Sequence, residues 1–306
     1  MKMNKLFNFL KSTTLLLFLF SHTAVAETSD ATGAATTTTP VPSGSSDVSI
    51  PLRYFEQSPD GVVNHRAREE FVQLYNKFKD NEELKGSEVA LQRVLAFYAK
   101  NKDGIPRSCG GDLDATSSPR GEKLDAVNKI DNQDFILLVD YTKPHVADRF
   151  FILDMKSGKV ESCPVAHGYG SNSNCPPEHQ VRCNGKIKCK ITSEVNNRSG
   201  GGATSRGFYL TDEGYRSSQN TFNSGSPRSS GHNALNLRGL LGGVNDKALD
   251  RSVVFHRASY AENMCSSSAG CPAICPQLFE DYKDKVKRSL MYVHTPEDEE
   301  KPQPDC

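Results

Sequence analysis

The sequence has no tryptophan, no excess of either charge and no long hydrophobic run. Its 306 residues include 37 Lys+Arg and 37 Asp+Glu, so no global charge draws the chain towards nucleic acid or a membrane surface. The apolar run 15–20 is too short to span a bilayer. We find no internal repeat. A hydrophobic content of 36% instead fits a soluble globular protein with many polar loops.

The N-terminus has the pattern of an export signal. A basic start precedes the apolar run, and Ala24-Val25-Ala26 is a small-x-small cleavage site. We predict a signal peptide over 1–26 and a destination in the periplasm or cell envelope, or secretion, with no membrane span after signal removal. An ordinary N-terminal helix is the alternative. Residues 27–49 are rich in Thr, Ser and Ala and predict a disordered linker.

Two hydrophobic periodicities divide the rest of the chain. Between 65 and 100, apolar residues recur at helical spacing and are interrupted at Asn81 and Gly86, which predicts two helices in a helical lead-in over 50–125. From residue 135 the period becomes that of strands, beginning with a β-meander. Strands are predicted at 135–141, 149–155, 160–166, 207–210, 233–237, 252–256 and 289–293, and one more helix at 276–286. The polar tail, 295–306, is predicted to be disordered after His294.

Three short segments carry reactive side chains: HGYGS at 167–171, VVFH at 253–256 and SSSAGCPA at 266–273. In the last, Gly270 lets the backbone bend so that consecutive N–H groups converge beside the Cys271 thiol, where they can stabilise an oxyanion. His256 ends a buried strand fifteen residues earlier, a loop length that allows it to return as a base. A disulfide-bonded Cys271 and a structural His256 are the competing interpretations.

Residues 135–293 resemble the murein L,D-transpeptidase catalytic domain family, which has a YkuD-like β-fold. The resemblance rests on six segments in the same order: RFFILDMKSGKV, HGYGSNS, ATSRGFYLTDEGY, LNLRGLLGGVND, RSVVFHRASY and SAGCPAI. It implies a mainly β catalytic domain over 126–294, a sandwich or barrel, and an α+β chain overall because of the helical lead-in. The chain departs from the broader pattern at Ala269, where that pattern has His, and at Ala273, where it has Arg or Asn.

The resemblance implies a cysteine-dependent L,D-transpeptidase or L,D-carboxypeptidase whose partners are peptidoglycan peptide stems. It assigns Cys271 as the nucleophile, His256 as the base, and the N–H groups of Gly270 and Cys271 as oxyanion donors. No cofactor or metal is required, because every reacting group belongs to the protein. Candidates for substrate binding are His167, Gly168, Ser268 and Arg251, and Gly207, Phe208, Tyr209 and Arg238 for the shape of the cleft. Two alternatives stay open: a non-catalytic cell-wall-binding module with Cys271 in a disulfide, and a cysteine peptidase that cuts L,L bonds.

Nine cysteines in an exported chain indicate disulfides, because that compartment is oxidising. With Cys271 set aside as the nucleophile, the remaining eight permit four disulfides and one free thiol. Their pairing is not fixed by the sequence, and a Cys265–Cys275 bridge across the nucleophile is one candidate. Three of the cysteines lie in an insertion, 174–202, that matches no segment of the family. A zinc site of His179, Cys183 and Cys189 is a weaker alternative, because their spacing fits no zinc pattern.

Overall fold

The computed structural model describes residue 55 and residues 64–172, 175–183, 185–189, 191–192, 195–216, 232–263 and 266–300. The predicted signal peptide and linker lie outside the described residues, as does 301–306. Within the described ranges, no helix is long and apolar enough to cross a membrane.

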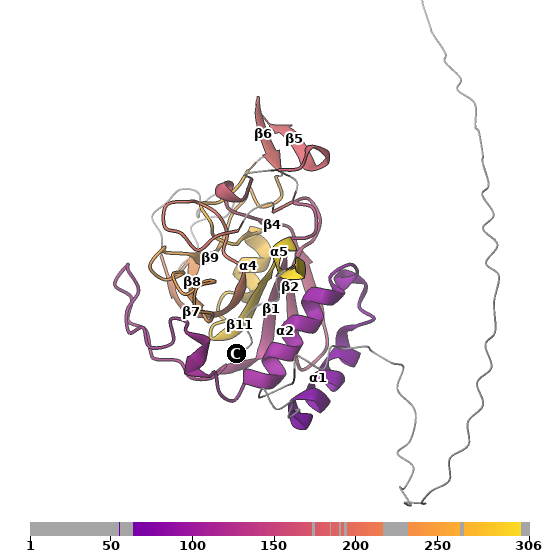
Figure 1. Cartoon of the computed structure of the whole chain (residues 1–306), viewed down its shortest axis with the longest axis vertical. Coiled ribbons are helices and arrows are strands. Elements are labelled where there is room, and N and C mark those ends of the chain that lie inside the picture. The colour runs from indigo at the N-terminus through magenta and orange to yellow at the C-terminus, as the bar shows by residue number, and fades with distance from the viewer. Residues whose placement is uncertain are drawn as a thin grey trace, which may run out of the picture. The chain divides into compact units, whose positions relative to one another are not determined.

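Two helices precede the strands, as the periodicity predicts: α1 (His65–Phe78) and α2 (Glu88–Asn101). The Asn64 side chain accepts the N–H of Ala67 at 3.0 Å and so caps the start of α1. A 3₁₀ turn at Glu82–Leu84, headed by Asn81, separates the helices. Helix α2 packs on the sheet over β1 (Asn132–Asp140) and β11 (Ser289–His294), as Figure 1 shows.

Nine strands form one sheet in the order β3-β2-β1-β11-β7-β8-β9-β10-β4. The remaining strands are β2 (Phe150–Asp154), β3 (Val160–Cys163), β4 (Val165–Ala166), β7 (Gly207–Tyr215), β8 (Ala234–Gly239), β9 (Val254–Arg257) and β10 (Ala273–Ile274). The predicted meander is confirmed, since β1, β2 and β3 pair antiparallel in turn. The predicted strand over 160–166 is split at Pro164, which has no N–H to give to a ladder.

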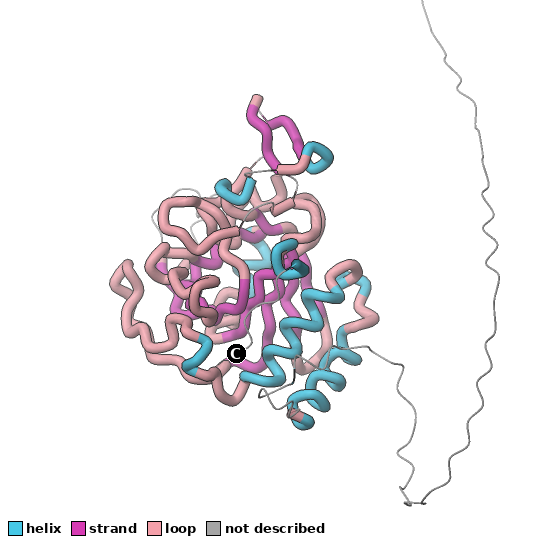
Figure 2. Tube along the Cα trace, in the orientation of Figure 1, coloured by secondary structure: helices cyan, strands magenta, loops and turns pink. Residues whose placement is uncertain are grey.

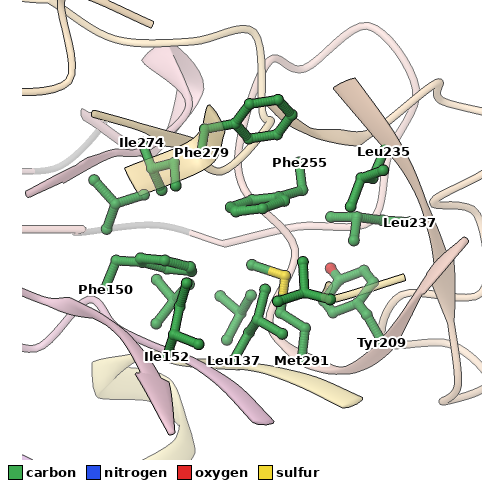
Figure 3. Packing of buried hydrophobic residues seen from close by; sticks show 14 of the residues in the cluster. Leu137, Phe150, Ile152, Tyr209, Leu235, Leu237, Phe255, Ile274, Phe279 and Met291 are labelled. Atoms are coloured by element: carbon green, nitrogen blue, oxygen red, sulfur yellow. The ribbon is translucent and has the colours of Figure 1, made fainter. Parts of the chain in front are cut away.

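The main hydrophobic core lies inside this sheet. Figure 3 shows Phe150, Ile152 and Leu137 facing Phe255 and Phe279 across it. The rings of Phe150 and Phe255 stack with centroids 5.3 Å apart, although their strands lie far apart in the strand order. The sheet is therefore nearly closed, and the predicted mainly β domain with helices at its N-terminal end is confirmed. Loops join most of the strands (Figure 2).

Three local predictions differ from the structure. Helix α4 (Pro276–Tyr282) ends before residue 286, and the chain continues in turns to β11. The tail predicted to be disordered begins with a short helix, α5 (Pro296–Glu300). Its Asp298 is fully buried, accepts the N–H of Thr295 at 2.9 Å and pairs with Arg206, contacts that fix the first turn. The insertion contains an unpredicted hairpin, β5 (Gln180–Cys183) and β6 (Lys186–Cys189), which forms its own two-stranded sheet (Figure 1).

Arg238 on β8 organises the loop that precedes the sheet. Its guanidinium, 0% exposed, pairs with Asp212 at 2.6 Å. It also donates to the backbone carbonyls of Asp112 at 2.7 Å and Asp125 at 3.0 Å, and to those of Leu113 and Ala115. One buried side chain thus holds the loop 112–125 against β8, which fixes where that loop runs.

Replacing Arg238 with Met is expected to lower the free energy of unfolding by about 3–5 kcal/mol, because it leaves the buried Asp212 carboxylate with only Arg288, 3.7 Å away, and releases the loop carbonyls. Urea denaturation measures the change. The matched control is Arg107→Met, which removes an exposed Arg107–Asp114 pair and should change stability by less than about 1 kcal/mol. Equal effects of the two variants would contradict a structural role for the buried pair.

Candidate active site

The three reactive segments of the sequence meet at one place in the fold. Gly168 forms a parallel bridge with Ser268. The N–H of Ser268 donates to the carbonyl of His167 at 2.9 Å, and that of Tyr169 donates to the carbonyl of Ser268 at 2.8 Å. Strand β10 follows Cys271 and pairs in parallel with β9, which carries His256. The structure therefore assembles a site from segments that are up to about a hundred residues apart in the sequence.

The Cys271 thiol lies against the start of β9. The parallel register that pairs Ala273 with His256 places Cys271 opposite Val254. The Val254 N–H donates to Sγ at 3.4 Å, and the side chain packs on Ala234 and Val254. Cys271 is half-buried and carries a free thiol, which opposes the alternative that it is disulfide-bonded. Burial raises the pKa of this thiol above its usual range, although the hydrogen bond from Val254 works in the other direction.

His256 lies on the same face of β9 as Val254, because side chains alternate along a strand and Phe255 between them enters the core. Its side chain is 1% exposed. Nδ1 lies 2.9 Å from the carbonyl oxygen of Arg257, which can only accept, so Nδ1 carries the proton and Nε2 the lone pair. Burial lowers the pKa of His256 to about 4. The imidazole is therefore neutral near pH 7, with its basic nitrogen directed away from the Arg257 carbonyl.

Two arginines set the local charge at the site. Arg120 and Arg251 each favour the Cys271 thiolate and lower the pKa of that thiol, and Arg120 also lowers the pKa of His256. Arg120 is exposed, and its Nη2 donates to the Ser252 carbonyl at 3.1 Å, two residues before Val254. Sequence reasoning missed Arg120, because it precedes every segment of the family resemblance. Only the path of the loop 112–125 brings it to the site.

The backbone around Cys271 is held by Ser268. Its hydroxyl donates to the Cys271 carbonyl at 2.6 Å and accepts the Gly270 N–H at 3.2 Å. Gly270 has φ +114°, and a Cβ there would lie 2.9 Å from the carbonyl oxygen of Ala203, so the position requires glycine. Of the two predicted oxyanion donors, the Gly270 N–H is engaged by Ser268. No hydrogen bond among the described residues occupies the N–H of Cys271.

His167 and Gly168 form the wall beside this loop. The His167 side chain is buried, and its Nδ1 accepts from Arg149 Nη2 at 3.1 Å. Arg149 is fully buried and also donates to the Val165 carbonyl at 2.7 Å, a supporting role that the strand pattern did not reveal. A Cβ on Gly168 would lie 2.8 Å from the Gly270 Cα, so these two glycines allow the segments to touch.

The other residues predicted for the cleft make contacts that support the fold. Arg251 donates to the carbonyls of Ala203 at 2.6 Å and Asn196 at 3.0 Å, which ties the loop 196–205 to the site. Phe208 and Tyr209 are buried, with Phe208 stacked between other rings and the Tyr209 hydroxyl bonded to the Ser205 carbonyl. Phe208 and Tyr209 point to opposite faces of β7, the first towards α2 and the second into the main core, and Arg238 holds the loop 112–125, so none of the three lines the cleft directly.

The cysteines differ from the sequence prediction. Cys175 pairs with Cys189. Cys109 and Cys183 each take part in a further disulfide. The zinc alternative therefore loses both of its thiolates. Among the described residues the structure has three free thiols, Cys163, Cys271 and Cys275, where the sequence predicts one, and the free Cys275 contradicts the candidate Cys265–Cys275 bridge. Cys163 and Cys275 are buried, and only Cys271 of the three is partly exposed.

A half-buried thiol just before β10 and a neutral imidazole on the neighbouring β9, with a backbone donor beside them, define a site suited to nucleophilic chemistry. The sequence profile described as "L,D-transpeptidase catalytic domain" matches residues 119–294. The chain belongs to this family. A search of curated proteins finds no match.

Solved structures with some likeness to the chain include an L,D-transpeptidase from Mycobacterium smegmatis, with 15% identity and a TM-score of 0.29 over 53% of this chain and 59% of that one. An L,D-transpeptidase from Mycobacterium tuberculosis H37Rv has 15% identity and a TM-score of 0.29 over 53% of this chain and 57% of that one. L,D-transpeptidase 3 from Mycobacterium tuberculosis, in complex with a faropenem-derived adduct, has 16% identity and a TM-score of 0.27 over 53% of this chain and 60% of that one. The chain spans less than two thirds of each, and these TM-scores are too low to add to the family assignment.

Proposed function

We propose that the protein is an exported peptidoglycan-modifying enzyme that transfers acyl groups of stem peptides through a Cys271 thioester. The observation that carries the proposal is the register of β9 and β10, which holds the Cys271 sulfur at the Val254 N–H, on the face of β9 that carries His256. Membership of the L,D-transpeptidase family supports the choice of substrate.

In the proposed reaction, Nε2 of His256 takes the proton of the Cys271 thiol and the sulfur attacks the carbonyl carbon of the L,D bond before a terminal D-Ala. The oxyanion forms beside the Cys271 N–H, with the Gly270 N–H as a second donor if it leaves Ser268. His256 then gives the proton to the leaving amine, and D-Ala departs. An amine of a second stem resolves the thioester into a 3–3 cross-link, and water resolves it into a tripeptide.

The electrostatics favour proton transfer during attack over a resting ion pair. Burial raises the pKa of the Cys271 thiol and lowers that of His256 to about 4, so both groups are neutral before substrate binds. The thiolate develops only as the carbonyl is attacked, when Arg120 and Arg251 stabilise its negative charge. His256 thus acts as a general base in this proposal.

Mass spectrometry of the purified protein with a disaccharide-tetrapeptide tests the proposed function. We expect a covalent adduct on Cys271, release of D-Ala, and a 3–3 dimer when an amine acceptor is present. A carbapenem, which offers a strained amide, should acylate the same thiol. A tripeptide as the only product would replace transpeptidation with carboxypeptidase action. Absence of both adduct and D-Ala would favour the wall-binding alternative.

Arg120 is proposed to attract the acidic stem, whose terminal carboxylate approaches the site. Arg120→Gln should lower kcat/KM for a tetrapeptide by about tenfold or more, because a charge-assisted contact is worth about 1.5–3 kcal/mol. A C-terminally amidated tetrapeptide should lose this dependence. The matched control is Lys123→Gln, which removes an exposed positive charge from the same loop. Equal losses on both substrates, or in both variants, would contradict recognition of the carboxylate by Arg120.

A further inference from the structure

Two buried thiols face each other where the sheet closes on itself. Strands β3 and β4 are the two ends of the nine-stranded order, yet only Pro164 separates them in the chain. We call this place the seam, defined by β3, Pro164 and β4. Cys163 ends β3, and Cys275 follows β10, the partner of β4.

The strand register places these cysteines close together. Ile274 pairs with Val165 in the antiparallel ladder between β10 and β4, so one further step of this register sets Cys275 beside Pro164, the chain neighbour of Cys163. Both side chains are buried in the same hydrophobic cluster. A hydrogen bond joins them and lowers the pKa of Cys275, while burial raises the pKa of Cys163. Two thiols in contact within one apolar cluster are placed to react with each other.

We propose that Cys163 and Cys275 form a disulfide in the mature protein and that this bond locks the seam. The two residues are more than a hundred positions apart in the sequence, so the bond closes a long loop. It joins the end of the β1–β3 meander to the segment that carries the nucleophile, because Cys275 lies four residues after Cys271. With it, Cys271 becomes the one thiol left among the described residues.

The oxidant is a disulfide, either that of a thiol–disulfide oxidoreductase or oxidised glutathione, and it acts while the chain folds and both thiols are accessible. One cysteine loses a proton, and its thiolate attacks the oxidant's sulfur and releases the first oxidant thiol. The second cysteine loses its proton and attacks the mixed disulfide, which releases the second oxidant thiol. The protein gives up two protons and two electrons, and the oxidant's disulfide becomes two thiols.

Peptide mapping of the full chain tests the bond without any assay of activity, so its outcome is independent of the proposed function. The protein is refolded in reduced and oxidised glutathione, denatured without reductant, alkylated and digested. The expected result is a Cys163–Cys275 cross-linked peptide, with Cys271 alkylated. Cys163 and Cys275 alkylated as fully as Cys271, or Cys275 linked to another cysteine, would overturn the proposal.

A second measurement uses matched variants. Cys163→Ala with Cys275→Ala should lower the melting temperature of the unreduced protein by roughly 5–15 °C, because the long loop is no longer closed. Cys163→Ala alone should make Cys275 alkylatable in the denatured, unreduced protein. The control, Cys271→Ala, should leave the cross-linked peptide intact. If Cys275 resists alkylation equally with and without Cys163, the proposed pairing is wrong.

Discussion

Replacing Cys271 with Ser is expected to lower the rate of acyl-enzyme formation by a factor of about 10³ or more. Serine keeps the size of the side chain and its place against the Val254 N–H. However, an alcohol is far less acidic than a thiol, and a neutral imidazole whose pKa is about 4 is too weak a base to compensate. Substrate binding should survive, because the wall formed by His167 and Gly168 is unchanged.

The measurement is the rate of covalent adduct formation with a disaccharide-tetrapeptide, together with binding of the same ligand at equilibrium. Ser266→Ala, in the same loop, is the control and should acylate at nearly the wild-type rate. If Cys271→Ser releases D-Ala within tenfold of the wild type and carries no adduct at position 271, Cys271 is not the nucleophile. Loss of binding together with loss of turnover would indicate that the variant disturbs the loop held by Ser268.

The second large effect concerns His256. His256→Ala should slow acylation by about 10²–10⁴-fold, because the thiol then has no positioned acceptor for its proton. The control, His65→Ala, changes an exposed residue at the start of α1 and should leave the rate unaltered. A rate within about twofold of the wild type would exclude His256 as the base and make His167 the next residue to replace.

The pH profile separates this role from a purely structural one. Because burial lowers the pKa of His256 to about 4, the wild-type acylation rate should hold through pH 6.5 and fall only as pH approaches about 4. In the unfolded chain a His has a pKa of about 6.5 and takes up its proton at a higher pH than the folded His256 does. The folding stability contributed by the neutral imidazole is therefore lost as pH falls from about 6.5 to 4. An acid limb centred near pH 6.5 in the folded enzyme would contradict the buried, neutral imidazole.

The proximity of the two proposed site residues, Cys271 and His256, could be predicted from the sequence because each lies in a short, distinctive segment next to a strand. VVFH and SAGCPAI predict the imidazole and the thiol, and the register between β9 and β10 then brings them together. Helical spacing likewise located α1 and α2, since an apolar stripe must meet the core. These features depend on local patterns, which a single sequence displays.

Features that depend on distant partners were not predictable. Arg120 reaches the site only because Arg238, on a strand more than a hundred residues later, holds the carbonyls of its loop. Helix α5 was hidden by its acidic composition, which predicts disorder until Asp298 is seen buried against Arg206. The pairing of cysteines has the same character, because proximity in space and not spacing in the sequence decides it.

The stacking of Phe97 has a practical consequence for dividing the chain. Phe97, on α2, stacks on Phe208 with ring centroids 3.8 Å apart, and Phe208 stacks on Tyr292 at 4.5 Å. Helix α2 thus covers β7 and β11 through these aromatic contacts. The helix itself lies outside residues 119–294, the range that the family profile matches. A fragment trimmed to that range would expose this aromatic row to water and invite aggregation. A fragment made for expression should therefore keep α2, together with α1, which packs on it.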